Sequence, residues 1–309
     1  MTSPSAVPLP AAPAESPAST GGHPTRGGRR FPLDWLGLVP FMVMVGLFLL
    51  LPTGVIAVSA FLDGGNHFTL ANLAQLGLPR IALTFRNSLQ LSVISAAISA
   101  PIGALLAYAV SVGNPDGLLR RVTSSLAGVF AQAGGVPLAL GFIATYSGEG
   151  LLTLLFAQIG LKPFGDASWL YTVSGLILVY TYFQVPLMFL IFMPAIDGLR
   201  PQWREAVVNL GGSTWEYWRH VGFPVLRAPF LGALLVLFAN SFSAYATAAV
   251  LVTQGNPIAP LQIRNTFTSE VVFGTANVGK ALALVMIVIV AIVMTLNSII
   301  QKRVSRWSQ

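Results

Sequence analysis

Charged residues divide this chain into six long stretches that contain no charge at all. These stretches are residues 35–62, 87–115, 122–148, 167–196, 228–263 and 281–301. Each is longer than the roughly 20 apolar residues that a helix needs to cross the hydrocarbon core of a bilayer. With 54% hydrophobic and only 9% charged residues, the composition lies outside the range of soluble globular domains. The sequence therefore predicts an all-α membrane protein with six transmembrane helices.

The chain also contains a shorter charge-free stretch and a polar N-terminal segment. Gly150–Leu161 has only 12 residues, so we expect a short helix at the membrane interface or over a pore mouth instead of another span. Residues 1–30 are rich in Pro, Ala, Ser, Thr and Gly, with almost no large apolar side chain. A segment of this composition cannot bury a core, and we expect a disordered cytoplasmic tail.

The first apolar stretch has an alternative interpretation as a secretory signal peptide. Arg29 and Arg30 would form its basic start, and Ala60 would end its cleavage site. However, residues 36–57 are longer than the 7–15 apolar residues typical of such signals. We therefore predict an uncleaved first transmembrane helix within residues 31–62.

The distribution of lysine and arginine predicts the orientation in the membrane. With six spans, twelve of the 17 basic residues fall on the side of the N-terminus, and five fall on the other side: Arg80, Arg86, Lys162, Arg264 and Lys280. Cytoplasmic loops carry the excess of basic residues. We expect both termini and the loop 199–227 in the cytoplasm, with the protein in the cytoplasmic (inner or plasma) membrane. The net charge of +7 follows from this asymmetry, so no nucleic-acid partner is expected.

The loop 199–227 has the sequence pattern of two short helices joined by a tight turn. Pro201 suits the first turn of a helix, and Trp203, Ala206, Val207 and Leu210 then recur on one apolar face. Glu205 lies off that face. The spacing predicts a first amphipathic helix with its acid exposed.

The second helix of the loop has its own start and stop signals. Gly211-Gly212 supplies the left-handed residue that ends the first helix, and Ser213 with Glu216 forms a capping box for the second. We expect Pro224 to stop this helix or kink its exit, and His220 to cap it.

This loop resembles the cytoplasmic EAA loop of permease subunits in binding-protein-dependent ABC importers. That pattern runs Glu-Ala-Ala, three residues, Gly, nine residues, an aliphatic residue, any residue, then Leu-Pro. It falls, with every spacing kept, on Glu205, Ala206, Val207, Gly211, Val221, Phe223 and Pro224. Val207 and Phe223 depart from the pattern, and both replace one apolar residue by another. Arg86–Leu89 and Gly103–Tyr108 extend the resemblance into the spans.

The resemblance implies a type I ABC importer permease (MetI-like) fold, with a permease core over residues 87–301. It implies four kinds of partner: a dimer of ABC ATPases, a second permease subunit that is a different chain, an extracytoplasmic solute-binding protein and the bilayer. It further implies that this chain is no enzyme and has no cofactor, because ATP is bound by the partner. The residues implied in ATPase coupling are Glu205, Ala206, Gly211, Gly212 and Pro224. The chain resembles the spermidine/putrescine permease group, which implies a polyamine-like solute.

Neutral polar residues inside the spans are the candidates for lining a solute pathway. In lipid such side chains face the bundle or a wet cavity. The densest group runs from Asn240 to Thr247, where a continuous helix would put Ser241, Tyr245 and Ala248 on one face. We take Gln184, Asn240, Ser241 and Tyr245 as pathway candidates, with hydrogen bonding between helices as the alternative. The pairs Gly103–Ala107 and Gly141–Ala144 suit close helix packing.

Other functional patterns in the sequence are weak. Gly274–Ala281 resembles a nucleotide-binding P-loop, but Ala281 lacks the hydroxyl that would hold Mg²⁺, and an apolar stretch follows. We interpret Gly279-Lys280 as a flexible start of the sixth span. The three histidines are too scattered for a metal site, and no acid lies centrally in a span. A secondary transporter or channel remains the alternative function, and a membrane-embedded enzyme is a third.

Overall fold

The computed structural model describes residues 34–63, 65–114, 116–161, 168–252, 256–268 and 276–305. It comprises two compact units, with the boundary between Leu51 and Pro52. The predicted tail 1–30 and the first residues of the P-loop-like segment, including Gly274, lie outside the described residues.

Regular structure in the described residues is helical, apart from one isolated bridge between Leu62 and Phe68. In chain order the elements are α1 Asp34–Val45, η1 Gly46–Leu50, α2 Leu51–Ser59, α3 Ala71–Ala74, η2 Gln75–Gly77, α4 Pro79–Ser111, α5 Leu118–Gln132, α6 Val136–Tyr146, α7 Leu151–Gln158, η3 Ser168–Tyr171, α8 Val173–Asp197, α9 Pro201–Asn209, α10 Thr214–Tyr217, η4 Trp218–Gly222, α11 Phe223–Ser243, α12 Ala246–Leu251, α13 Ala259–Thr268 and α14 Ala276–Ser305.

Six helical segments are long and apolar enough to cross a membrane, which confirms the predicted number. They are Gly37–Ser59, Pro79–Ser111, Val136–Gln158, Val173–Asp197, Thr214–Ser243 and Val278–Lys302. Within the first unit, α1 and the π-helical turn η1 leave large apolar side chains exposed, among them Phe41 and Phe48. Exposed apolar surface of this kind suits an apolar environment.

Two of the predicted spans have wrong boundaries because the backbone breaks inside the charge-free stretch. The predicted third span, 122–148, is interrupted after Gln132, and Gly135 adopts φ +100°. The third candidate span therefore begins at Val136 and includes α7, the short helix that we expected to remain outside the spans. The predicted fifth stretch, 228–263, is not one helix, because α11 ends at Ser243.

Helices α4 and α8 make the most extensive contact in the second unit, and Gly103 lies in it. A Cβ atom at Gly103 would lie 2.5 Å from Cβ of Met188 and 2.6 Å from the carbonyl oxygen of Val185. Ala107 is fully buried on the same side of α4. The predicted close packing at Gly103 and Ala107 is thus confirmed. At Gly141 it is wrong, because an added Cβ would meet nothing within 4 Å.

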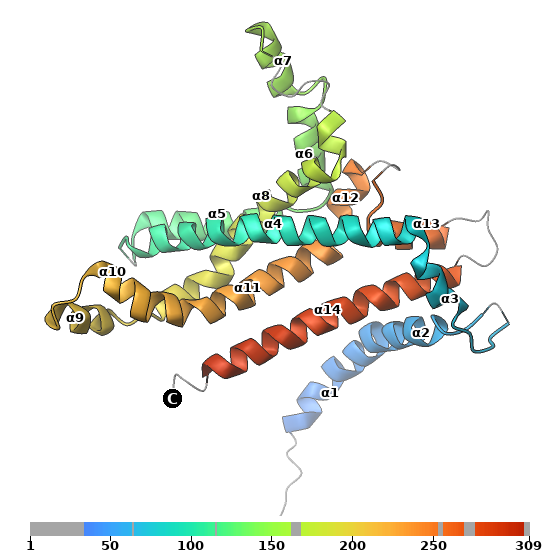
Figure 1. Cartoon of the computed structure of the whole chain (residues 1–309), viewed down its shortest axis with the longest axis horizontal. Helices are drawn as coiled ribbons and strands as arrows, with labels where there is room; N and C mark the ends of the chain where they lie inside the picture. The colour runs from blue at the N-terminus through green and yellow to red at the C-terminus, as the bar shows by residue number, and fades with distance from the viewer. Residues whose placement is uncertain are drawn as a thin grey trace, which may run out of the picture. The chain divides into compact units, whose positions relative to one another are not determined.

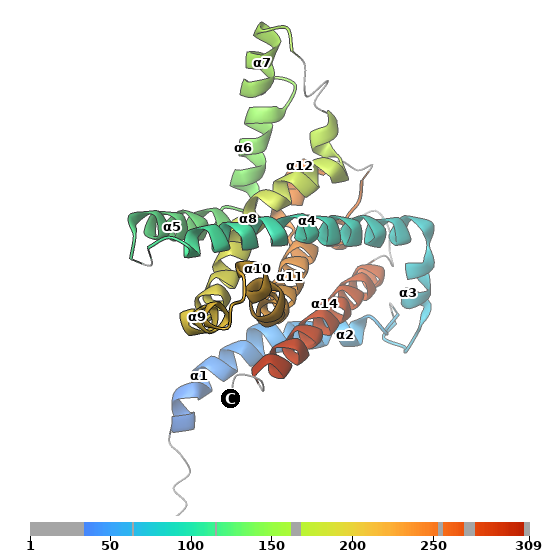
Figure 2. The ribbon, with the colours of Figure 1, turned by 60° about the vertical axis from the view of Figure 1, so that its left-hand side comes forward.

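Helices α5 and α11 pack on this pair, and α14 packs on α11 in turn. Helix α11 lies between α4 and α14, as Figures 1 and 2 show. Helix α5 packs on α8, and the ion pair between Arg120 and Asp197 joins them. Helices α6 and α7 lead away from α4 in both views, and α6 contacts α12.

We expect Gly103→Val to destabilise the protein by about 1–3 kcal/mol, the usual cost of overpacking a close contact. The added side chain would push α4 away from the backbone of α8. The melting temperature of the purified protein in detergent should fall. It is measured by heating samples and quantifying the folded protein that remains by size-exclusion chromatography. Gly128→Val is the matched control, because Gly128 lies in helix α5 with nothing within 4 Å of an added Cβ. Equal melting temperatures for both variants would contradict the assigned contact.

Candidate functional site

The first candidate site is the loop formed by α9, α10 and η4. Helix α9 begins with Pro201 directly after Arg200, as predicted. Trp203 and Val207 are half-buried, whereas Ala206 and Leu210 are exposed, Leu210 to 87%. The predicted apolar face is therefore only half used for packing within the chain. Glu205 is exposed as expected and forms no hydrogen bond or ion pair with another described residue.

The turn after α9 depends on two glycines with different roles. Gly211 adopts φ +79°, the left-handed conformation that was predicted to end the helix. Its N–H donates to the carbonyl oxygen of Val208, and the N–H of Gly212 donates to that of Val207. A Cβ atom at Gly212 would lie 2.6 Å from the side chain of Val207. Gly211 thus supplies the backbone conformation, and Gly212 permits the close approach.

The predicted capping box at the start of α10 is confirmed. The N–H of Ser213 donates to the Glu216 carboxylate over 2.6 Å, and the Ser213 hydroxyl oxygen accepts from the N–H of Glu216 over 3.3 Å. His220 Nδ1 lies 3.1 Å from the carbonyl oxygen of Glu216. Its predicted role as a helix cap is wrong, because His220 lies inside η4 and the helix continues into α11. These contacts leave Trp215 71% exposed at the tip of the loop.

Pro224 does not stop the second helix, contrary to prediction. Residues 218–222 form the π-helical turn η4, which continues directly into α11, and Pro224 occupies the first turn of α11. The missing N–H of a proline costs little at this position. The departure from a regular α-helix between α10 and α11 is instead the wider π turn η4. Such turns are frequent at functional sites.

An aromatic contact that sequence reasoning missed fastens the loop to the membrane helices. The ring of Trp218 meets that of Tyr108 edge to face, with centroids 5.1 Å apart. Gly222 makes room for Trp218, because a Cβ there would lie 2.6 Å from its indole. The rings join the loop to the end of α4, whereas Glu205, Val208, Leu210 and Trp215 remain free to meet a partner.

The second candidate site contains two of the four predicted pathway residues. Gln184 of α8 and Ser241 of α11 are fully or almost fully buried, and both contact Ser95 of α4. Gln184 Nε2 donates to Ser95 Oγ over 3.1 Å, and Ser95 Oγ lies 2.9 Å from Ser241 Oγ. We call these three residues the Ser95 cluster. They hydrogen-bond across three helices. Hydrogen bonding between helices was the alternative that the sequence left open for these residues. Sequence reasoning missed Ser95 itself.

The other two pathway candidates, Asn240 and Tyr245, lie outside this cluster. Asn240 is exposed and Tyr245 is half-buried. The predicted common face of Ser241, Tyr245 and Ala248 is wrong, because Ala244 is extended, with ψ 120°, and separates α11 from α12. The four candidates therefore do not form one lining surface.

The helix breaks at Gly135 and Ala244 are held by side chains from other elements. The N–H of Gly135 donates to Thr247 Oγ1 over 2.8 Å, and the hydroxyl of Tyr180 donates to the carbonyl oxygen of Ala244 over 2.8 Å. In lipid, backbone groups outside regular helices must find such partners. Tyr180 and Thr247 therefore stabilise irregular backbone within the bundle.

The described part of the P-loop-like segment is helical. Gly279, Lys280 and Ala281 lie within α14, and Ala281 is completely buried. A Cβ at Gly279 would lie 3.1 Å from Thr266 of α13, so the glycine serves close packing. The predicted flexible start of the sixth span is therefore wrong, and these three residues do not form a phosphate-binding loop.

Six apolar helices and an exposed loop with a tight glycine turn define a multi-span membrane protein. Residues 99–307 match the family model described as "Binding-protein-dependent transport system inner membrane component". The chain belongs to this family of type I ABC importer permeases and has the MetI-like fold.

Curated relatives transport different solutes. The ferric transport system permease protein FbpB of Actinobacillus pleuropneumoniae is 25% identical over 69% of this chain and 31% of its own length. The sulfate transport system permease protein CysW of Synechocystis is 24% identical over 84% of this chain and 92% of its own. The spermidine/putrescine permease PotC homolog of Mycoplasma genitalium is 29% identical over 55% of each chain. The chain spans about a third of the length of two FbpB relatives, 31% and 33%.

A solved structure shares the fold. It is the crystal structure of a bacterial ABC transporter involved in the import of the acidic polysaccharide alginate. One of its chains superposes with a TM-score of 0.70 at 15% identity, covering 90% of this chain and 96% of that one. At this identity the likeness concerns the fold alone.

We expect Ser241→Ala to lower the free energy of unfolding more than Ser243→Ala, its matched control on the same helix. Ser241 bonds to α4, whereas the Ser243 hydroxyl donates to carbonyl oxygens of its own helix. Hydrogen bonds between membrane helices contribute about 0.6 kcal/mol on average and about 1.7 at most. A double-mutant cycle with Ser95→Ala, measured by denaturant unfolding in detergent micelles, should give a coupling free energy in this range. Additive effects of Ser95→Ala and Ser241→Ala would show that their hydroxyls do not interact.

Proposed function

We propose that this chain is a non-catalytic permease subunit that forms half of a solute pathway and is driven by a separate ATPase dimer. The observation that carries the proposal is the loop α9–α10, whose turn at Gly211 presents an unpaired acid and exposed apolar side chains. Family membership supports a transport role. No cofactor is assigned to this chain, and ATP is bound and hydrolysed by the partner.

The loop is suited to transmit movement because it is rigid in itself and fastened to the spans. The capping box and the Gly211–Gly212 turn fix α9 against α10. Trp218 and the continuous passage from η4 into α11 connect α10 to α4 and α11. When the ATPase dimer closes, a displacement of Glu205 and Ala206 would reach the spans through η4, and Pro224 lies at this junction.

Two more partners complete the proposed importer. A second permease subunit, a different chain, would supply the other half of the pathway, and an extracytoplasmic binding protein would deliver the solute. A further solved relative of the fold is the alginate ABC transporter in complex with a pentasaccharide-bound periplasmic protein, with a TM-score of 0.66 and 14% identity. The family description, which names binding-protein-dependent transport, supports the binding protein.

For the solute we propose a polyamine-like organic cation. A pocket of about 480 Å³ beside the break at Gly135 is lined by Phe130, Phe142, Tyr146 and Tyr182, with no charged side chain in its wall. Aromatic ring faces attract organic cations. The PotC homolog supports this class, whereas other relatives carry iron, sulfate or thiamine names. Uptake of labelled spermidine that is unaffected by excess sulfate or thiamine would support the proposal, and competition by sulfate would overturn it.

Glu205→Ala should leave the bundle intact but weaken docking of the ATPase. Loss of a hydrogen bond to a charged group costs about 1.5–3 kcal/mol, tenfold or more in affinity. ATPase recovered with the tagged permease after detergent extraction should fall, and solute uptake should fall with it. Gln202→Ala is the control, because Gln202 is another exposed residue of α9. Normal ATPase recovery with Glu205→Ala would exclude Glu205 as a docking residue.

Gly211→Val should abolish coupling through backbone strain. A β-branched residue at positive φ costs about 1–3 kcal/mol and would redirect α10. Gly160→Val carries matched strain, because Gly160 has φ +75° and also has nothing within 4 Å of an added Cβ. At equal expression we expect uptake to be lost with Gly211→Val and kept with Gly160→Val. Equal uptake by both variants would mean that the turn at Gly211 is only a linker.

The topology predicts which positions between the spans an impermeant thiol reagent reaches in intact cells. The chain contains no cysteine, so single cysteines can be introduced without background. Cysteines at Asn66 and Gln262 should be labelled, and a cysteine at Gly212 should react only after the cells are permeabilised. The reason is the excess of basic residues on the side of the loop 199–227. Labelling of Gly212→Cys in intact cells would show that the orientation is the opposite of the predicted one.

A further inference from the structure

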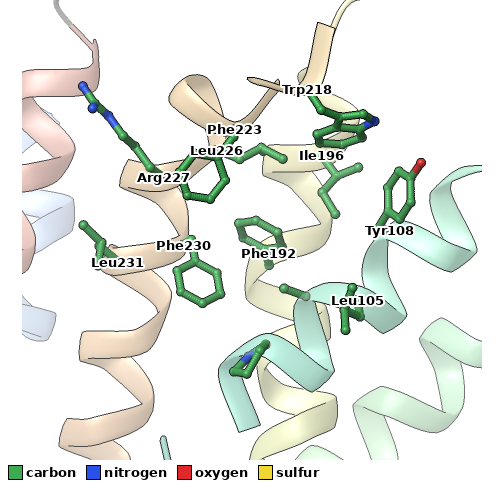
Figure 3. A pocket seen from close by; sticks show the side chains of 12 residues that line it. Leu105, Tyr108, Phe192, Ile196, Trp218, Phe223, Leu226, Arg227, Phe230 and Leu231 are labelled. Carbon is green, nitrogen blue, oxygen red and sulfur yellow. The ribbon is translucent and has the colours of Figure 1, made fainter. Parts of the chain in front are cut away.

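A large apolar groove lies between α4 and α11, beside the junction of the loop with the spans. Its volume is about 650 Å³. Residues of α4 and of η4–α11 form its walls, and residues of α8 form its floor (Figure 3). The lining consists of Pro101, Ala104, Leu105, Tyr108, Phe192, Ile196, Trp218, Phe223, Leu226, Arg227, Phe230 and Leu231.

The surface of the groove is almost entirely apolar, and the polar side-chain atoms of its lining residues lie at its edge, toward one end. Arg227, Tyr108 and Trp218 are its only lining residues with polar side-chain atoms. Figure 3 shows their polar ends toward the same end of the groove, whereas Leu105, Phe230 and Leu231 lie at the other. This distribution matches an amphiphile with a polar head and an apolar tail. Tyr and Trp favour the level of lipid head groups in membrane proteins.

The length of the groove argues against a spanning helix as its occupant. From Trp218 to Leu231, the longer wall, a helix advances about 20 Å, at about 1.5 Å per residue. A helix that crosses the hydrocarbon core is about 30 Å long. The groove would therefore hold only about two thirds of such a helix, whereas it can enclose the upper part of an acyl chain.

Arg227 determines the kind of head group. Its side chain is exposed and forms no ion pair with any described carboxylate. A guanidinium binds phosphate oxygens through two parallel hydrogen bonds. We propose that the groove binds an anionic phospholipid, with an acyl chain between α4 and α11 and the phosphate at Arg227. Bound there, the lipid braces Trp218 and the π turn through which the loop joins α11.

Fluorescence of Trp218 tests this proposal directly, because its indole lines the groove. The other five tryptophans, Trp35, Trp169, Trp203, Trp215 and Trp307, are replaced by phenylalanine in the full chain, and circular dichroism checks the fold. The variant is reconstituted into vesicles of phosphatidylcholine that contain phosphatidylglycerol brominated on its acyl chains. A second set of vesicles carries the bromine on phosphatidylcholine instead. We expect stronger quenching of Trp218 by brominated phosphatidylglycerol at equal bromine content.

Two substitutions separate the head group from the tail. Arg227→Gln should lower the preference for phosphatidylglycerol about fivefold, the contribution of one basic residue near anionic lipid. Arg121→Gln is the control, because Arg121 is an exposed arginine of α5 outside the groove, and it should keep the preference. Ala104→Phe should fill the groove and reduce quenching by both lipids.

Three outcomes would overturn the proposal. The first is equal quenching by the two brominated lipids. The second is an unchanged preference after Arg227→Gln. The third is weak quenching by both lipids, together with a disulfide between a cysteine introduced at Leu105 and a second protein chain, since this would identify a protein as the occupant. None of these readouts depends on solute transport.

Discussion

The close approach of α4 and α8 is the contact on which α5 and α11 pack. It requires the absence of a side chain at Gly103, because the backbone and side chain of α8 occupy that space. In a membrane the hydrophobic effect does not drive helices together, because lipid tails are as apolar as the side chains. Small residues instead let the backbones approach closely, so that van der Waals packing stabilises the contact. Helix α11 then packs on both, and Ser95, Gln184 and Ser241 hydrogen-bond across the three helices. The same three helices form the walls and floor of the groove at Arg227.

Local features of this protein could be predicted from sequence, because they depend on residues a few positions apart. The charge-free stretches gave the correct number of spans. The turn at Gly211 and the capping box of Ser213 and Glu216 were also predicted correctly, since backbone conformation and neighbouring side chains alone determine them. The resemblance of the loop to an importer permease agrees with the family match over residues 99–307.

Features that depend on distant residues could not be predicted. The break after Ser243 lies in sequence that suits a continuous helix, and Tyr180 stabilises it from α8. The break after Gln132 did carry a local signal that sequence reasoning missed, Gly134-Gly135 followed by Pro137, and Thr247 stabilises it from α12. The π turn η4 replaced the expected stop at Pro224 for a similar reason, because Trp218 packs against Tyr108, 110 positions earlier in the chain. Gln184 and Ser241 looked like pathway residues, but only the tertiary structure brings both to Ser95.

Site-specific crosslinking tests most directly whether the α9–α10 loop docks on a separate ATPase. A single cysteine at Leu210, which is 87% exposed, is coupled to a short photoactivatable reagent in membranes that contain the whole transporter. A cysteine at Val129 of α5, which is 65% exposed, serves as the control. We expect a crosslink from Leu210 to a soluble nucleotide-binding subunit and none from Val129. Its absence at Leu210, in a transporter that retains uptake, would contradict the account.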